Sequence, residues 1–246
     1  MVRITDVKSY AEGMAHPSAE IRTALLEAAE QLLVASEDSD VSTRAVCDRV
    51  GVGQPVLYRI FGDKQGLLDA LAEVGLERYA ARKAELDATA DPIADLRRGW
   101  TDHMAFAAEN PAIYRLMFSP RPGVALRARD GVLELLKGGL RRVAAMGALR
   151  HDLDESAAMI LSANVGLAMN RITQPEVYDP PGVSAALRDA IFDRILVEPA
   201  EGTRDASIAV VSRQLAAQIE TTPPAELAVE ESALLDVWLK RLSRSS

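Results

Sequence analysis

The stretch from 42 to 64, STRAVCDRVGVGQPVLYRIFGDK, constrains the fold of this chain most strongly, because it predicts two short helices joined by a tight corner. In its first half, Ala45, Val46 and Val50 recur at a spacing that places them on one helical face. Gly51 follows the last turn, at the position where a glycine with positive φ ends a helix at little cost. This order of elements indicates a helix-turn-helix, whose second helix enters the major groove of DNA.

The second short helix is expected from about Gln54 to Phe61. Pro55 falls in its first turn, where a missing N–H costs nothing. Four apolar residues are expected to form its buried side: Val56, Leu57, Ile60 and Phe61. Gly62 ends this helix, Asp63 is expected to cap the helix that follows, and Thr43 is expected to cap the first short helix.

The polar and cationic residues left on the exposed side of the motif suit contact with DNA, since each can reach a phosphate or a base edge. We call the second short helix the reading helix, since it is the one expected to enter the major groove, and Pro55 lies at its start. The candidate DNA-binding residues are Thr43, Arg44, Gln54, Pro55, Tyr58, Arg59 and Lys64. The chain carries a formal charge of −8. That balance does not argue against a DNA binder, because only the contacting face must be basic.

These residues resemble the DNA-binding segment of the tetracycline-repressor (TetR) family of one-component regulators. The resemblance covers roughly Ile21 to Leu68 and is carried by VSTRAVCDRVGVGQPVLYRIFGDKQGLL, with these residues at the family's positions: Gly51-Val52, Leu57-Tyr58, Phe61 and Lys64. Two positions depart from the family: Pro55 stands where a small flexible residue is common, and Ile60 where a polar or aromatic DNA contact is frequent. The resemblance implies a DNA-binding regulator with a ligand cavity in its C-terminal domain.

Composition favours closely packed helices, because 48% of the residues are hydrophobic, aromatic residues are few, and Ala and Leu dominate. We therefore predict an all-α fold with an N-terminal helix-turn-helix DNA-binding domain and a C-terminal helical effector-binding and dimerisation domain. The expected division is a flexible N-terminal arm at 1–17, a DNA-binding domain at 18–86 and a ligand-binding and dimerisation domain at 92–246. The connecting helix, 63–86, would be roughly 36 Å long and is the natural lever between the domains.

Helical periodicity and breaker residues predict the remaining elements. The other expected helices are Ser18 to Ala35, Pro92 to Glu109, Pro111 to Phe118, Val124 to Leu149, Asp154 to Arg171, Val183 to Val197, Arg204 to Glu220 and Ala225 to Leu242. The proline-rich stretch from Gln174 to Gly182 is expected to form a turn.

A cluster of aromatic residues and methionines in the C-terminal half predicts an apolar pocket finished by a few polar groups. The candidate pocket residues are Trp100, His103, Met104, Phe106, Tyr114, Met117, Phe118 and Asn164. The alternative is that these side chains form a solid core, which is the more common role of any one of them.

Two helices are candidates for a dimer interface built as a four-helix bundle. Ala158, Ser162 and Gly166 recur every four residues, so one stripe of small side chains would let another helix approach closely. The helix from Arg204 to Glu220 is apolar on two sides, and Val211 and Leu215 lie on one of them. The alternative is that both helices pack only within one subunit.

Other functional classes have little support in the sequence. A single cysteine, Cys47, rules out an intrachain disulfide and is expected to be an inert core thiol. His16, His103 and His151 are far apart and form no metal-binding motif, and there is no catalytic or phosphate-binding motif. No apolar run reaches the ~20 residues needed to cross a bilayer. We expect no cofactor, no metal, no enzymatic activity and no membrane contact, in a protein of the cytoplasm.

The sequence thus predicts a DNA-binding transcriptional regulator, a dimeric repressor that binds a palindromic operator in double-stranded DNA and is released by a small apolar ligand. The alternative is an effector-independent architectural DNA-binding protein whose C-terminal domain only dimerises.

Overall fold

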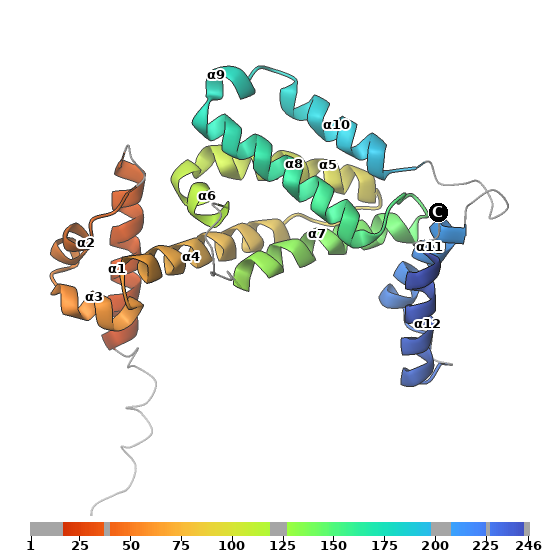
Figure 1. Ribbon diagram of the computed structural model, residues 1–246, viewed down its shortest axis with the longest axis horizontal. Helices are drawn as coiled ribbons and strands as arrows, with labels where there is room; N and C mark the ends of the chain where they lie inside the picture. The colour runs from red at the N-terminus through yellow and green to blue at the C-terminus, as the bar shows by residue number, and fades with distance from the viewer. Residues whose placement is uncertain (1–16, 37–39, 119–126, 198–207, 225–226, 244–246) are drawn as a thin grey trace, which may run out of the picture. The chain divides into compact units, whose positions relative to one another are not determined.

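The computed structural model describes residues 17–36, 40–118, 127–197, 208–224 and 227–243 (Figure 1). Within these ranges the chain forms twelve helices and no strand, which confirms the all-α prediction. The helices are α1 (Pro17–Ala35), α2 (Thr43–Val50), α3 (Gln54–Phe61), α4 (Lys64–Ala84), α5 (Pro92–Glu109), α6 (Pro111–Phe118), α7 (Arg127–Ala145), α8 (Leu153–Thr173), α9 (Pro175–Tyr178), α10 (Val183–Ile195), α11 (Ile208–Thr221) and α12 (Val229–Leu242). Of the helices described, none is long and apolar enough to cross a membrane. The predicted N-terminal arm lies outside the described residues, apart from Pro17.

The chain divides into two compact units. The first contains the chain up to Gly75 together with 112–126, so it includes α1, α2, α3, the first half of α4 and nearly all of α6. The second contains 76–111 and 127–246. Helix α4 therefore belongs to both units.

In the first unit α1 packs against α2 and α3, and the side chains buried between these helices are mainly aliphatic. Its buried side chains include Leu25, Leu33, Val46, Leu57, Leu67 and Leu71. Helix α6 packs closely on α4 at Gly75, where an added Cβ would lie only 2.5 Å from Cγ2 of Ile113. Two short helices cannot bury a core alone, so α1 supplies the surface on which the helix-turn-helix is held.

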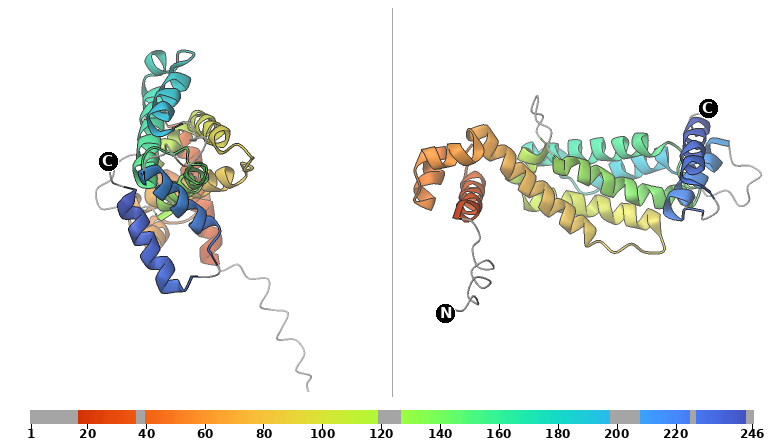
Figure 2. Two further views of the ribbon diagram at one scale, coloured as in Figure 1. Left: turned by 90° about the vertical axis from the view of Figure 1, so that its right-hand side faces the viewer. Right: turned by 90° about the horizontal axis from the view of Figure 1, so that it is seen from below.

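The second unit is a layered helical bundle around α8, which packs against α5, α7 and α10 (Figures 1 and 2). Helix α11 packs on α7, and α12 packs on α11. An isolated antiparallel bridge joins Leu149 to Leu196, with Arg150 N–H donating to Ile195 O at 2.7 Å. The bridge ties the end of α10 to the turn after α7.

Several helix boundaries follow directly from glycine and cap residues, and others differ from the prediction by a few residues. Helices α5 and α6 begin and end where they were predicted. Helix α7 stops at Ala145 rather than Leu149, because Gly147 adopts a φ of 72°, which ends the helix. The predicted turn between Gln174 and Gly182 contains the short helix α9, which begins at Pro175. Asp63 caps α4 as predicted, since its Oδ1 accepts the N–H of Gly66 at 2.7 Å.

Candidate nucleic-acid interface and ligand pocket

The corner between α2 and α3 is built from a serine cap and a left-handed glycine. Ser42 is extended, and its Oγ accepts the N–H of Ala45 at 3.3 Å. The prediction that Thr43 caps this helix is therefore wrong, because Thr43 is already its first helical residue. Gly51 has a φ of 77°, as predicted, and its N–H donates to the Cys47 carbonyl at 2.9 Å. This positive φ turns the chain sharply into α3.

Three candidate DNA-binding residues from the two helices come together at this corner. Nε2 of Gln54 donates to Oγ1 of Thr43 at 3.4 Å, and that hydroxyl also lies 3.5 Å from the Tyr58 hydroxyl. Tyr58 is 41% exposed although it is a large aromatic residue. We call these residues the Thr43–Gln54–Tyr58 cluster. Their hydrogen-bonding groups lie at the surface, where they can reach phosphates and base edges.

The candidate cations of the motif differ in their partners. Arg44 forms an open, solvent-exposed ion pair with Asp48 at 3.9 Å. Lys64 pairs with Asp40 at 2.5 Å, and its hydrogen bond holds the pKa of that carboxyl below its usual value. Pro55 and Arg59 are exposed on α3. The pairing with Asp40 was missed by the sequence reasoning, because nothing in the pattern relates a loop residue to a helix start 24 positions away.

Cys47 lies behind this surface, buried between the two short helices, and burial raises the pKa of its thiol. A buried thiol that stays protonated is a poor nucleophile and a poor metal ligand. Over the described ranges, no group of three or more His, Cys, Asp or Glu side chains is placed to hold a metal ion.

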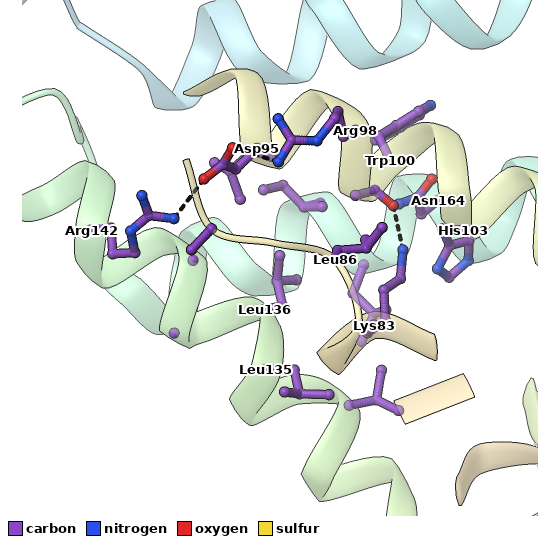
Figure 3. Close-up of a pocket in the computed structure, with 18 of the residues that line it drawn as sticks. Lys83, Leu86, Asp95, Arg98, Trp100, His103, Leu135, Leu136, Arg142 and Asn164 are labelled. Atoms are coloured by element: carbon purple, nitrogen blue, oxygen red, sulfur yellow. Dashed lines mark hydrogen bonds and ion pairs between the residues drawn. The ribbon is translucent and has the colours of Figure 1, made fainter. Parts of the chain in front are cut away.

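The second unit contains a cavity of about 310 Å³ (Figure 3). Its walls come from the end of α4, the α4–α5 connection, α5, α7 and α8. The lining residues are Tyr79, Lys83, Leu86, Asp87, Ala88, Asp95, Leu96, Arg98, Gly99, Trp100, His103, Val132, Leu135, Leu136, Gly138, Gly139, Arg142, Ile160, Leu161 and Asn164. The size lies at the lower end of the range for small-molecule sites.

The structure brings three of the predicted pocket residues to this cavity and places the others elsewhere. Trp100, His103 and Asn164 line it. Met104 and Phe106 are buried in the same unit but are not among the lining residues. The remaining three lie on α6 in the first unit, where two of them contact each other: Tyr114, Met117 and Phe118.

Buried polar groups form one side of the cavity. His103 is 1% exposed and shares a hydrogen bond of 2.7 Å between Nδ1 and the Tyr79 hydroxyl. Burial, together with the neighbouring Lys83 ammonium, lowers the pKa of His103 to about 3, so the ring is neutral. Burial also lowers the pKa of Lys83, whose Nζ lies 2.7 Å from Asp102 and donates to the Gly99 carbonyl at 2.6 Å.

An ion-pair cluster centred on Asp95 forms the opposite side. Its carboxylate lies 2.6 Å from Arg142 and 2.8 Å from Arg98, and it accepts the Thr89 hydroxyl at 2.5 Å. The Thr89 hydrogen bond and Arg142 hold the pKa of Asp95 well below its usual range. The cluster fastens the α4–α5 connection to α5 and α7. Sequence reasoning missed it, since Asp95 and Arg142 are 47 positions apart.

The candidate dimer residues lie on open surfaces of the second unit. Ala158, Ser162 and Gly166 are all exposed on α8, and a Cβ added at Gly166 would meet no atom within 4 Å. On α11, Val211 is half-buried and Leu215 is 41% exposed. Further large apolar side chains are exposed on α11 and α12: Ile208, Val229, Leu234, Val237, Trp238 and Leu242.

Comparison with known proteins agrees with this architecture. Residues 25–71 match the model of the family described as bacterial regulatory proteins, tetR family. Over 97 residues the chain is 31% identical to the nucleoid occlusion factor SlmA of Marinomonas sp. (strain MWYL1), which covers 39% of this chain and 49% of SlmA. The chain thus spans about half the length of that curated relative.

Solved structures share the fold over a longer stretch. The regulator FadR from Bacillus subtilis, solved in complex with stearoyl-CoA, aligns with a TM-score of 0.56 and 16% identity over 70% of this chain and 95% of FadR. SmeT, the repressor of the Stenotrophomonas maltophilia multidrug efflux pump SmeDEF, aligns with a TM-score of 0.55 and 20% identity over 72% of this chain and 91% of SmeT. At these identities the likeness establishes the fold.

Proposed function

From the match of residues 25–71 to the tetR family of bacterial regulatory proteins, we propose that this chain is a dimeric transcriptional repressor of that family, released from a palindromic operator by a small apolar ligand. In this proposal the protein acts in the cytoplasm, because that is where a bacterial regulator meets its DNA. SmeT is a repressor, and FadR was solved with stearoyl-CoA bound. Both are precedents in the same fold for the two halves of the proposal.

The observation that carries DNA binding is the Thr43–Gln54–Tyr58 cluster. On the exposed side of a helix-turn-helix, side chains of Gln54 and Tyr58 on α3 each lie within 3.5 Å of the Thr43 hydroxyl on α2. A polar surface of this kind gains little for stability, because its groups bond equally well to water. Presented on a reading helix, the same groups can bond to base edges and phosphates.

The cavity supports ligand control. Its walls include the end of α4 and the α4–α5 connection, and α4 begins at Lys64 beside the reading helix. Two reading helices meet successive major grooves when their spacing matches one turn of DNA, roughly 34 Å. A ligand that prefers a conformer with another spacing shifts the population away from DNA, and complete release takes about 5.5 kcal/mol of differential affinity.

The exposed small-residue stripe on α8 and the exposed apolar side chains of α11 support a second copy of the chain as partner. Apolar side chains that remain uncovered in one subunit are typical of an interface. We assign the seam to Ala158, Ser162 and Gly166 on α8, with Val211 and Leu215 on α11. Gly166→Leu should then give helical monomers that no longer bind a palindromic site, and a normal dimer in sedimentation would remove α8 from the seam.

The proposal is tested by selecting binding sites from random double-stranded DNA and then titrating apolar compounds against the selected complex. Recovery of a palindrome, a dimer in sedimentation and release of the DNA by at least one compound are the expected results. Replacement of Tyr58 and Gln54 by Ala should abolish selection, whereas Val34→Ala, at an exposed apolar position on α1, should not. Selection without symmetry, from a monomer, would contradict the proposal.

SlmA is named a nucleoid occlusion factor and not a transcriptional regulator, so we keep a second candidate, an architectural DNA-binding protein whose C-terminal domain only dimerises. Thermal unfolding with and without ligands separates the two candidates, since a ligand that binds the native state raises the melting temperature. A domain that only dimerises would show no stabilisation by any apolar compound.

A further inference from the structure

The pocket contains one polar group whose hydrogen-bonding requirement is unmet. Asn164 of α8 lines the cavity and is only 5% exposed. Within the described part of the chain, its Oδ1 is buried and has no hydrogen-bond partner. A buried acceptor that no protein group bonds is costly, so it needs a donor from another molecule. Its position at a cavity wall indicates that a bound molecule supplies the missing donor.

The cationic side chains around the same cavity are already paired with carboxylates of the protein. Lys83 is paired with Asp102, and Arg98 and Arg142 share Asp95. Asp87 adds a further carboxylate to the lining. A charged ligand would be desolvated on entry and would have to compete with these pairs. The cavity is therefore suited to an uncharged molecule.

The lining between the polar groups is apolar. Figure 3 shows Leu86, Leu135 and Leu136 between Arg142 on one side and His103 with Asn164 on the other. This arrangement fits a molecule with an aliphatic or aromatic body whose polar group lies at the Asn164 side. Trp100 can form part of this apolar lining because its indole N–H already donates to the Ser184 hydroxyl at 3.0 Å.

We propose that the pocket takes an uncharged molecule with an apolar body and an O–H or N–H group, and that this group donates its hydrogen to Oδ1 of Asn164. The inference rests on the proposed function, because it names the class of ligand for that same site. A site built to bond a donor discriminates strongly against an analogue that lacks it, since the buried acceptor is then left unpaired.

Two isomers of equal size provide the test on the unmodified protein. 1-Octanol and heptyl methyl ether have the same formula, but only the alcohol can donate a hydrogen bond, and octanoate adds a charge to a similar chain. By calorimetric titration, 1-octanol should bind about tenfold more tightly than the ether, or better, and also more tightly than octanoate. Equal affinities for the two isomers, tightest binding of octanoate, or no binding of any of the three would overturn the inference.

Substitution of Asn164 then assigns the preference to its side chain. Asn164→Leu removes the unpaired acceptor at similar volume, so the protein should remain folded and the ratio of the two affinities should fall to near one. The matched control is Asn170→Leu on the same helix, at an exposed position outside the pocket lining, which should keep the wild-type ratio. A ratio unchanged in Asn164→Leu would overturn the assignment. If that variant does not fold, the isomer comparison still decides.

Release of DNA, measured on the same samples, separates this inference from the proposed function. If 1-octanol binds with the expected preference but never releases selected DNA, the ligand class stands and ligand-controlled repression fails. If both isomers bind equally and both release DNA, repression by an apolar ligand stands and the role of Asn164 fails.

Discussion

The two compact units treat polar side chains in opposite ways. In the first unit the buried side chains of α1, α2 and α3 are apolar, while Thr43, Gln54 and Tyr58 meet at the surface. In the second unit polar side chains are buried beside a cavity: His103 against Tyr79, Lys83 against Asp102, and Asn164 with an unbonded oxygen. In our proposal, the polar groups of the first unit are exposed so that they can bind DNA. Those of the second unit are buried beside a cavity, where they can bind a small ligand.

The two units also differ in how far apart in the sequence their contacting residues lie. The corner of the first unit is defined by neighbours in sequence, such as Ser42 capping α2 and Gly51 ending it. The polar contacts of the second unit join residues 24, 47 and 84 positions apart, as in Tyr79–His103, Arg142–Asp95 and Trp100–Ser184. Four predictions test the comparison, ordered by their expected effect on the free energy of unfolding.

Truncating the core of the first unit should have the largest effect. Leu57 of the reading helix α3 is fully buried, and α3 packs against α1 and α2. Leu57→Ala should lower the free energy of unfolding by about 2–5 kcal/mol, because it removes apolar contacts and leaves a cavity. Urea denaturation measures the loss, and operator binding should fall with it.

The matched control is Leu135→Ala in the second unit, since Leu135 lines the pocket and is partly exposed. That change should cost little stability and alter binding of apolar compounds instead. Equal stability losses at the two positions would contradict the contrast between a solid core and a cavity wall.

Acidification should lower the free energy of unfolding through His103, which is buried in the second unit. His103 binds a proton near pH 6.5 when unfolded and only near pH 3 when native. Between these values the unfolded state holds more protons, so the free energy of unfolding falls as the pH is lowered, by about 1.4 kcal/mol per unit. From pH 6 to pH 4.5 the loss should be roughly 2 kcal/mol.

Denaturation series across this range, on wild type and on His103→Gln, provide the measurement. The variant cannot gain the proton, so its stability should fall less steeply with acid than that of the wild type. Parallel slopes for the two proteins would show that His103 is not held neutral by burial.

The parts of the structure that could be predicted from the sequence lie mainly in the first unit, although the Lys64–Asp40 pair of that unit was not predicted. Gly51 and Gly62 specify turns, and Pro55 the start of a helix, through their own backbone geometry, so the helix-turn-helix could be predicted from a short stretch of sequence. A cavity forms where the side chains of helices that are distant in sequence do not fill the space between them, and a short stretch of sequence does not show this. Trp100, His103 and Asn164 were therefore found as plausible members, but nothing in the pattern of the Pro92 helix indicated that Asp95 would bond to Arg142 on α7.

Removal of the helix cap should have a moderate effect confined to the first unit. Ser42→Ala deletes the side-chain acceptor for the Ala45 N–H and should cost about 1 kcal/mol of stability. Thr43→Ala, one residue along, deletes no cap and should leave stability nearly unchanged while weakening DNA binding. Thermal melts and DNA titrations on the two variants provide the check. If Thr43→Ala were the more destabilising of the two, the cap would have been assigned to the wrong residue.

The smallest change in stability is expected at the Lys64–Asp40 pair, which is exposed and therefore contributes little to folding. Its effect should appear in DNA binding, because Asp40 occupies the ammonium that we assign to a phosphate. Lys64→Ala should weaken binding to all DNA sequences about equally and lower the salt slope by about one unit per site. Asp40→Asn should do the opposite at low salt, since it removes the competing carboxylate. Titrations at several salt concentrations on both variants decide the assignment: a changed sequence preference with an unchanged salt slope in Lys64→Ala would mean that Lys64 reads a base and does not bind a phosphate.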